Sequence, residues 1–405
     1  MACFRHSIIT TKEILSKTTG QFTRRASPSI CLYRRYSAAQ ITSNDELSTI
    51  VGRFPLRIDY AFGYGSAVLH QQNSNPSSSM VDIIMSVPDP YKWHTENLSR
   101  HPEHYSMMSR LGGPSFVTWL QCNFGAKLYF HPYVDVPISG SSDKRQIKYG
   151  IVSTSDLISD LRQWDYLYLA GRMHKPIVSI SLPSDAISVK EEKEGKRCKM
   201  TMLGEKDDIV SAQQSNLLAA VSTSLLLIGG ESGHSNNSSV IALPTSKLYA
   251  TIASLSYTGD FRMQTGAEDP NKITKLVETP GMLDLWEDMY TDTLNKLQEL
   301  GLLSVATKLG SNTADTRIEF DPNDIETRKQ LMNYLPPRLH NQSYQIIGSK
   351  GASGIPQGSL ALRSELAKIV SPAARSQGMK GMFTAGLSKS LKYAKAKFAK
   401  GRLKK

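Results

Sequence analysis

A glycine, a serine and an aspartate within residues 61–85 are the strongest candidates for chemistry in this 405-residue chain. Gly65 and Ser66 form a turn of small residues after an apolar run, and Asp82 follows sixteen residues after Ser66 inside a second apolar run. Small residues let backbone N–H groups and a hydroxyl approach triphosphate oxygens, and a carboxylate on a neighbouring strand holds Mg²⁺ between phosphates. This order favours nucleotidyl transfer. The alternative is a hairpin whose aspartate points into solvent.

Three further charged residues are candidates to complete such a site. Lys148 lies between apolar neighbours in an extended segment, and Asp260 and Arg262 share the turn TGDFRM. An arginine so placed clamps phosphate oxygens, whereas the alternative for each residue is an ordinary solvated side chain. Three histidines lie near one another in the sequence: His94, His101 and His104. An HxxH pair without a third ligand favours a structural cluster over a metal site.

Several other kinds of site are excluded. The sequence contains no GxxxxGK[ST] or HExxH motif, and GYGSAV matches neither GxGxxG nor GxSxG. No apolar run reaches the ~20 residues of a membrane-spanning helix. The cysteines form no CxxC or Cys/His pair, which argues against a zinc site or a disulfide scaffold: Cys3, Cys31, Cys122 and Cys198.

The net charge of +12 is unevenly distributed along the chain. Residues 1–40 carry a net +6, and residues 371–405 carry ten Lys/Arg and no acid, so subtracting these +16 leaves −4 for the middle of the chain. A mildly acidic body is not the composition of a nucleic-acid-binding surface, and we expect no nucleic acid as a partner.

Each basic end has its own interpretation. Residues 1–40 are rich in Arg and Ser/Thr and nearly free of acids, which indicates a mitochondrial presequence with RRYSAA as a candidate removal point. The alternative is a basic tail without that role. In residues 372–405, an apolar stripe of a helix opposes lysines: Phe383, Leu387, Leu391, Ala394 and Phe398 against Lys389, Lys392, Lys395 and Lys400. This pattern predicts binding to an anionic membrane surface, and packing on the acidic body is the alternative.

The elements that would position the candidate residues follow from hydrophobic periodicity. Four extended segments are predicted at residues 56–66, 80–87, 126–136 and 145–153. Helices are predicted at residues 45–51, 90–108, 153–173, 213–228, 244–256, 271–279 and 283–303. Residues 184–208 are dominated by charged and turn residues and favour an exposed hairpin or insertion, and residues 304–360 are mostly linker-like.

Six motifs occur in an order that is specific as a set: FGYGSAV, MVDIIMSVPDPYKWHTENLSRHPEHYS, GAKLYFHPYV, IKYGIVSTSDLISDLRQWDYLYLAGRMHKPI, SLSYTGDFRM and KGMFTAGLSKSLKYAKAK. With them the chain resembles the mitochondrial phosphatidate cytidylyltransferase family, first named for translocator assembly and maintenance. The resemblance covers about residues 48–400, apart from insertions near 185–212, 230–240 and 341–358.

The resemblance implies an α+β protein with a nucleotidyltransferase-fold mixed sheet, a smaller helical winged-helix-like domain and a C-terminal amphipathic helix. The expected domains are a presequence (1–40), a nucleotidyltransferase domain (41–212), a winged-helix-like domain (213–340), a linker (341–371) and a basic membrane-binding tail (372–405). The expected location is the matrix side of the mitochondrial inner membrane, with peripheral attachment.

The resemblance also implies the reaction of CTP with phosphatidic acid to CDP-diacylglycerol and diphosphate, with Mg²⁺, in cardiolipin biosynthesis. Gly65, Ser66, Lys148 and Arg262 would bind the CTP phosphates, and Asp82 would be the principal metal ligand. Nucleotidyltransferases commonly use a DxD or ExD pair of acids, but Ile84 occupies the second position here. Asp260 or Asp59 would then supply the second carboxylate. Two alternatives stay open: a nucleotidyltransferase with another acceptor, and a non-catalytic inner-membrane assembly factor. The sequence makes no prediction of oligomeric state.

Overall fold

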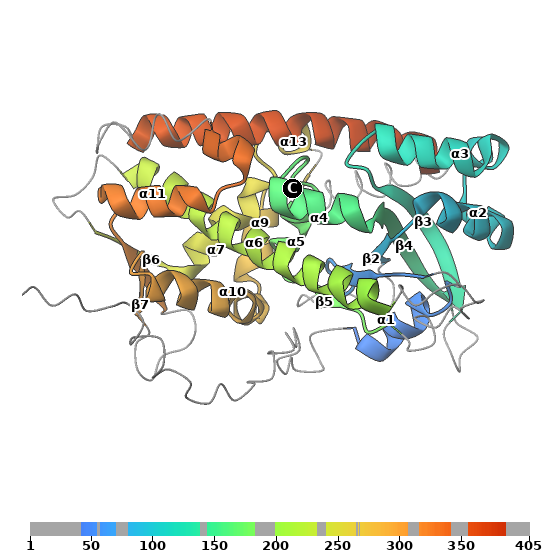
Figure 1. Ribbon diagram of the computed structural model, residues 1–405, viewed down its shortest axis with the longest axis horizontal. Helices are drawn as coiled ribbons and strands as arrows, with labels where there is room; N and C mark the ends of the chain where they lie inside the picture. Colours follow the sequence, from blue (N-terminus) through green and yellow to red (C-terminus); the bar gives the residue numbers. More distant parts are fainter. Residues whose placement is uncertain are drawn as a thin grey trace, which may run out of the picture. The chain divides into compact units, whose positions relative to one another are not determined.

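Two β-sheets and the helices packed on them make up the described part of the protein (Figure 1). The computed structural model describes residues 42–54, 57–69, 80–137, 144–182, 199–232, 240–264, 266, 268–306, 316–341 and 355–385. All of these residues belong to one unit, Tyr36–Lys405. The predicted presequence (1–40) lies outside the described residues, and so does most of the apolar and lysine stripe predicted for residues 372–405.

The larger sheet is mixed and has the strand order β3-β4-β2-β1-β5. β2 runs parallel to β4, whereas the other neighbouring pairs are antiparallel. The strand bounds are β1 Tyr60–Tyr64, β2 Val81–Val87, β3 Tyr129–Pro137, β4 Lys144–Ser153 and β5 Val178–Ser179. The predicted extended segments are therefore confirmed as strands, although the first begins only at Tyr60 rather than at Leu56.

The two faces of this sheet pack on different helices because successive side chains of a strand point to opposite sides. Ile83 and Tyr149 face a core shared with α1 (Asn44–Val51) and with Trp93 of α2 (Pro90–Arg100). Phe62 and Ile84 face a second core, built with residues of three helices: α4 (Thr154–Gln163), α5 (Leu169–Met173) and α6 (Lys199–Ser232). Asp82 lies on this second side, since Tyr64, its partner in the register, belongs to that core.

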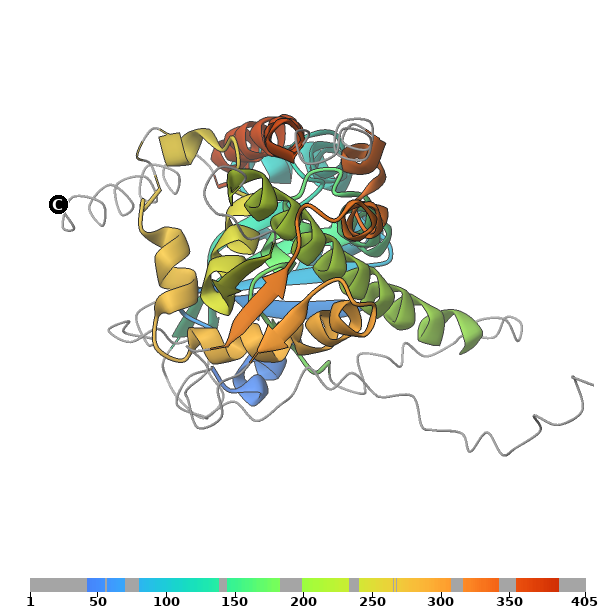
Figure 2. The same cartoon turned by 90° about the vertical axis from the view of Figure 1, so that its left-hand side faces the viewer.

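The smaller sheet is antiparallel, with the order β6-β8-β7. Its strands are β6 Ile241–Pro244, β7 Ser304–Ala306 and β8 Arg317–Phe320. The remaining elements are η2 Pro102–His104, α3 Met107–Asn123, α7 Thr245–Leu255, α8 Phe261–Gln264, α9 Lys272–Glu278, α10 Met282–Glu299, α11 Ile325–Asn333 and α13 Ile355–Ala385. Residues of both sheets share one hydrophobic core with α6, which Figure 2 shows crossing the view in yellow-green.

Two long helices differ from the expectations for the charged and linker-like segments. α6 begins at Lys199, so the end of the predicted hairpin 184–208 is helical, and α13 begins at Ile355 inside the predicted linker 304–360. That linker also contains β7, β8 and α11. The reason is tertiary: Leu362, Leu366 and other apolar residues of α13 are buried in the common core. The expected domain boundaries at 212/213 and 371/372 both fall inside these helices.

The predicted helix 153–173 is instead two helices joined by a tight connection. α4 ends at Trp164, which adopts a left-handed backbone conformation with φ 54°, and α5 starts at Leu169. The predicted helix 90–108 likewise becomes α2 followed by the short η2, because Pro102 interrupts it. Among the described residues, no helix is both long and apolar enough to cross a membrane.

Candidate functional site

Asp82 and Lys148 form an ion pair at the edge of the second core. The parallel register places them side by side on β2 and β4, and Lys148 Nζ donates to Asp82 Oδ1 at 3.0 Å. Their side chains are 26% and 21% exposed, so both reach solvent although strands of apolar residues surround them. Lys148 Nζ also lies 4.2 Å from the centre of the Phe130 ring. The register, which joins residues 66 positions apart, therefore brings the two predicted groups together.

Gly65 forms the turn that closes over Asp82. Its φ of +83° lies in the left-handed region that favours glycine, and a Cβ at this position would be 3.5 Å from Asp82 Oδ2. The carbonyl of Gly65 accepts hydrogen bonds from the N–H groups of Val68 and Leu69. Ser66 is exposed beside it. Gly65 thus lies against one carboxylate oxygen of Asp82 while Lys148 occupies the other, and Ser66 is open to an incoming ligand.

Arg172 of α5 adds a positive charge next to this pair. Its guanidinium lies 4.3 Å from the centre of the Tyr64 ring, and Tyr64 is the register partner of Asp82. Burial raises the pKa of Tyr64 far above its usual value, and the charge of Asp82 raises it further. The tyrosine therefore stays protonated and forms a neutral surface between the arginine and the carboxylate.

Asp260 and Arg262 form a second, self-contained pair. Asp260 is 2% exposed, and its carboxylate accepts hydrogen bonds from the backbone N–H, Nε and Nη2 of Arg262, at 2.6 to 3.1 Å. Both carboxylate oxygens are therefore engaged by one arginine. No hydrogen bond or ion pair joins Asp260 to Asp82 among the described residues. The structure orients Arg262 through Asp260, and the predicted metal role of Asp260 remains a prediction.

A pocket lies beside the Asp260–Arg262 pair, and Arg172 connects it to Asp82. Arg172, Lys175 and Arg262 all line it, with Tyr168 and Tyr257 among the other walls. Small apolar residues of α13 close one side: Val370, Ala373 and Ala374. Because Arg172 also stacks on Tyr64, the pocket adjoins the Asp82–Lys148 pair. Three basic side chains thus converge on one space, which suits an anionic ligand.

Lys175 is a buried cation in this pocket. It is 6% exposed, and its Nζ donates to the carbonyl of Gly171 and to Ser256 Oγ and lies 4.9 Å from the Tyr257 ring centre. Burial lowers the pKa of Lys175 well below its usual value, and the nearby Arg172 lowers it further. No ion pair with an acid is formed by Lys175 within the described ranges. A buried ammonium without a counter-charge is costly, so an anion in the pocket would stabilise it.

The connection between α4 and α5 holds these basic residues in place. Asp160 is buried, and its carboxylate accepts four backbone N–H groups at 2.8 to 3.0 Å, from Tyr166, Leu167, Leu169 and Ala170. Asn216 of α6 accepts from Trp164 Nε1 and binds His174 Nε2. The sequence prediction missed Asp160, Arg172 and Lys175. The only signal in the sequence for Arg172 and Lys175 was that two basic residues follow an apolar stretch.

Asp59 lies too far along the strand direction to share a metal with Asp82. Its backbone N–H donates to the carbonyl of Ser86, which is four residues beyond Asp82 on β2, or ~13 Å at the rise of a strand. Its carboxylate accepts hydrogen bonds from Arg57 and from Thr154 at the start of α4. Asp59 therefore supports that end of the sheet, and its candidacy as second metal ligand is wrong.

The three histidines form a cluster on the opposite face of the sheet. His94 is buried between Tyr105 and Gln121, and His104 Nδ1 bonds to the hydroxyl of Tyr149, whose side chain belongs to the α1–α2 core. Glu103 supplies the third potential ligand that the sequence pattern lacked, because the donor atoms of His101, Glu103 and His104 lie within 4.8 Å of one another. This cluster is separated by the sheet from Asp82 and takes no part in the candidate site.

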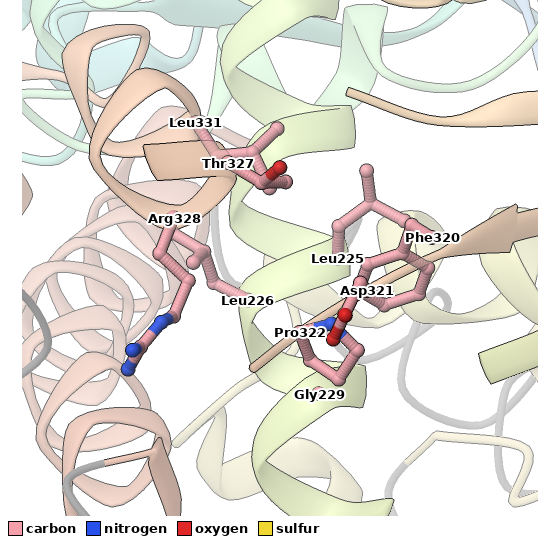
Figure 3. A pocket seen from close by; sticks show the side chains of 9 residues that line it. All are labelled: Leu225, Leu226, Gly229, Phe320, Asp321, Pro322, Thr327, Arg328 and Leu331. Atoms are coloured by element: carbon pink, nitrogen blue, oxygen red, sulfur yellow. The ribbon is translucent and has the colours of Figure 1, made fainter. Parts of the chain in front are cut away.

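A second hollow, between α6, β8 and α11, is apolar and narrow (Figure 3). Leu225, Leu226 and Phe320 dominate its wall, and a Cβ on Gly229 would lie 2.7 Å from Pro322 Cβ. Figure 3 shows the guanidinium of Arg328 pointing away from the other lining side chains. Without converging cations, this hollow does not suit a phosphate.

Comparison with known proteins finds one family across nearly the whole described chain. The family described as mitochondrial phosphatidate cytidylyltransferase matches residues 47–400. The chain is 30% identical to the protein of that name from Caenorhabditis elegans, over 88% of this chain and 98% of the relative. It is 32% identical to the Bos taurus protein over 87% and 92% of the two chains, and 30% identical to the Schizosaccharomyces pombe protein over 89% and 84%.

Proposed function

Because this chain belongs to the mitochondrial phosphatidate cytidylyltransferase family, we propose that it condenses CTP with phosphatidic acid to CDP-diacylglycerol and diphosphate. The observation that carries the proposal is the Gly65 turn against the Asp82–Lys148 pair, about a quarter of which is exposed to solvent. Phosphoryl transfer needs positioning and charge neutralisation more than covalent catalysis. A carboxylate and an ammonium at a small-residue turn provide both.

We propose a nucleotidyltransferase fold for the larger sheet and a winged-helix-like arrangement for the smaller one. Support for the first is the mixed sheet with its turn after β1 and its acid near the start of β2. Support for the second is the three-stranded antiparallel sheet β6-β8-β7 beside α7 and α10.

The triphosphate of CTP and Mg²⁺ would bind at the turn. Asp82 offers an oxygen on its Gly65 side that accepts no hydrogen bond within the described part of the chain, and Mg²⁺ in such sites is held by one or two carboxylates plus phosphate oxygens. The residues therefore fit the ion even with a single carboxylate. Bound there, Mg²⁺ would neutralise phosphate charge and orient the triphosphate. Lys148 and the backbone around Ser66 would contact the remaining phosphate oxygens.

The phosphate of phosphatidic acid would enter the adjoining pocket of Arg172, Lys175 and Arg262. Its phosphomonoester oxygen then attacks the α-phosphorus of CTP, the bond from that phosphorus to the bridging oxygen of the β-phosphate breaks, and diphosphate leaves. Arg172, between the two subsites, would reduce the repulsion between two anionic reactants. Asp260 contributes by orienting Arg262 rather than by contacting substrate.

The proposed location is the matrix side of the mitochondrial inner membrane. The relatives carry the word mitochondrial in their names, and residues 1–40 have the composition of a presequence. Peripheral attachment would come from the basic residues of the C-terminal segment.

The function is tested by incubating radiolabelled CTP, phosphatidic acid and Mg²⁺ with the purified protein and extracting lipid. We expect a labelled lipid product, and a loss of about 10³-fold for Asp82→Asn. Asp135→Asn is the matched control, because Asp135 is an exposed aspartate on β3 of the same sheet. Wild-type protein that makes no lipid product contradicts the function, and a fully active Asp82→Asn variant contradicts the site.

The acceptor pocket is tested separately by Lys175→Met, which removes the charge and keeps an unbranched buried side chain. We expect KM for phosphatidic acid to rise about tenfold while KM for CTP changes less than about twofold. Lys272→Met is the control, since Lys272 also lies beside Tyr257 but pairs with Glu268. An equal rise in both KM values would show that the pocket does not distinguish the acceptor from CTP.

A further inference from the structure

Helix α3 exposes several large apolar side chains to solvent. Met107 and Leu111 are 76% and 79% exposed, and Trp119 is 51% exposed. Met108 within the helix and Phe124 immediately after it are also exposed. Isolated exposed apolar residues are ordinary on a protein surface, but a succession of them along one helix indicates an interaction site.

The local sequence joins these side chains into one patch. Gly113 has φ 69° and precedes Pro114, so the helix is kinked there. Phe116 packs directly on Gly112, where a Cβ would lie 2.6 Å from Phe116 Cβ. The centre of its ring lies 6.0 Å from that of Trp119, and the rings of Trp119 and Phe124 have centres 5.2 Å apart. We call Met107, Met108, Leu111, Phe116, Trp119 and Phe124 the α3 patch.

The opposite side of α3 is firmly packed, so the exposure of the patch is not caused by a loosely attached helix. Val117 and Leu120 are buried in a core with Tyr105 and Tyr129. Ser109 Oγ bonds to the Tyr129 hydroxyl at 2.7 Å. The rigid inner side fixes which residues the outer side presents.

The C-terminal part of α13 lies beside the end of α3, as Figures 1 and 2 both show. Lys380 Nζ donates to the carbonyls of Leu120, Gln121 and Phe124, and Ser376 accepts from the N–H of Gly125. Met379, next to Lys380 in the sequence, is 54% exposed. The chain then continues into residues 386–405, which contain eight Lys/Arg and no acid.

We propose that the α3 patch is a membrane-insertion surface that enters the interface of an anionic phospholipid bilayer. Trp and Phe rings prefer the level of the headgroups, and apolar side chains beside a basic segment combine burial with electrostatic attraction. The bilayer is favoured over other occupants because Lys380 near the end of α13 bonds to the carbonyl of Phe124 in the patch, and the sequence that follows α13 carries eight Lys/Arg and no acid.

The position of the patch also suits a lipid substrate, and this step rests on the proposed function. α13 contributes Ala373 and Ala374 to the acceptor pocket, and Lys380 of the same helix donates to the carbonyl of Phe124 in the α3 patch. Ala374 and Lys380 are six residues apart, which is ~9 Å along a helix. A bilayer in contact with the α3 patch would therefore bring phosphatidic acid close to the pocket.

The tryptophans of the chain supply a direct test. Trp119 is half exposed, whereas Trp93, Trp164 and Trp286 are at most 2% exposed. Full-length protein is mixed with vesicles of phosphatidylcholine and phosphatidylglycerol that carry brominated acyl chains. We expect quenching of tryptophan fluorescence, which Trp119→Phe abolishes while vesicle binding, measured by flotation, is retained. Binding without quenching, or equal quenching in Trp119→Phe, overturns the proposal.

A second variant separates membrane contact from catalysis. Leu111→Gln is expected to lower vesicle binding, and turnover of phosphatidic acid in those vesicles, about tenfold. Turnover of soluble short-chain phosphatidic acid is expected to be unchanged, so a failure of the proposed function would appear as loss of both activities. Ile325→Gln on α11, 45% exposed, is the matched control.

Two other occupants predict different results. If residues 386–405 cover the patch, truncation after Ala385 increases quenching of Trp119 by acrylamide in the absence of vesicles. If a second copy covers it, Leu111→Gln lowers the sedimentation coefficient at high protein concentration. Either result, with no effect of vesicles on Trp119, contradicts the membrane assignment.

Discussion

Asp82, near the start of β2, and Asp260, in the turn before α8, have the same carboxylate but opposite surroundings. Asp82 is 26% exposed and accepts a hydrogen bond from Lys148, which lies on a neighbouring strand. Asp260 is 2% exposed and is held on both oxygens by Arg262, two residues away. The first carboxylate is accessible to a ligand, and the second is already satisfied.

This difference separates two ways in which an acid serves an anion-binding site. A partly exposed acid at a glycine turn is able to share a cation with phosphate oxygens. A buried acid bonded to an arginine instead fixes the direction of the guanidinium, and so preorganises it for binding an anion. Asp160 is also a buried acid with a positioning role. Its carboxylate holds the backbone that leads into α5 and so positions Arg172.

The largest stability effect is expected for Asp260→Asn. Removing one partner of a buried pair leaves Arg262 without its counter-charge, and we expect a loss of about 3 kcal/mol in the free energy of unfolding, less if solvent reaches the one-third-exposed arginine. Denaturant unfolding measures it. The double variant Asp260→Asn/Arg262→Leu should recover much of the loss, and no recovery would contradict the pairing. Asp82→Asn should cost much less stability, because its side chain reaches water.

The next-largest loss of stability is expected at acid pH, through His174 beside the pocket residue Lys175. Burial lowers the pKa of His174 to about 3, and its Nε2 bonds to Asn216 Oδ1. The unfolded chain takes up the proton near pH 6.5 while the folded chain excludes it, so stability is present above that pH and falls as the pH drops towards 3. By pH 4.5, two units below the unfolded pKa, the loss from this histidine is about 2.7 kcal/mol.

The measurement is denaturant unfolding between pH 7 and 4.5 for the wild type and for His174→Gln. The variant should show a smaller pH dependence. Equal dependence in both proteins would mean that His174 is not the group excluding the proton. His94, whose pKa burial lowers to about 4, is expected to contribute a separate loss of the same sign from the opposite face of the sheet.

Gly65→Ala is expected to have the smallest effect on stability. Alanine at φ +83° is strained by about 1 kcal/mol, and its methyl group would lie beside Asp82 Oδ2. We therefore expect a small loss in thermal stability together with weaker Mg²⁺-dependent binding of CTP, measured by calorimetry. Gly113→Ala, at φ 69° and ψ −173° on α3 with nothing near its Cβ, should lose at least as much stability without changing CTP binding.

The sequence predicted those features that are local. Four of the five strands of the larger sheet and the glycine turn depend on neighbouring residues, and they were found at or near the expected positions. The sequence singled out Asp82 and Lys148 because charged groups inside apolar strands need a partner, and the structure pairs them, while their roles in a site stay predictions.

What the sequence could not predict depends on contacts between distant segments. The parallel register of β2 and β4 decides that Asp82 meets Lys148. Arg172 looked like the polar end of the predicted helix 153–173 and Lys175 like a residue just beyond it. Only the break at Trp164 and the packing of α13 bring the two into one pocket. The helical start of α13 was missed because its Gly, Ser and Pro content favours a linker until Leu362 and Leu366 find a core.

The most direct test of the account is calorimetric titration of CTP, with and without Mg²⁺, into wild-type protein, Asp82→Asn and Asp260→Asn. We predict that Mg²⁺ strengthens CTP binding to the wild type and to folded Asp260→Asn, and that this increment disappears in Asp82→Asn. The account is contradicted if Asp82→Asn keeps the Mg²⁺-dependent increment, or if folded Asp260→Asn loses it.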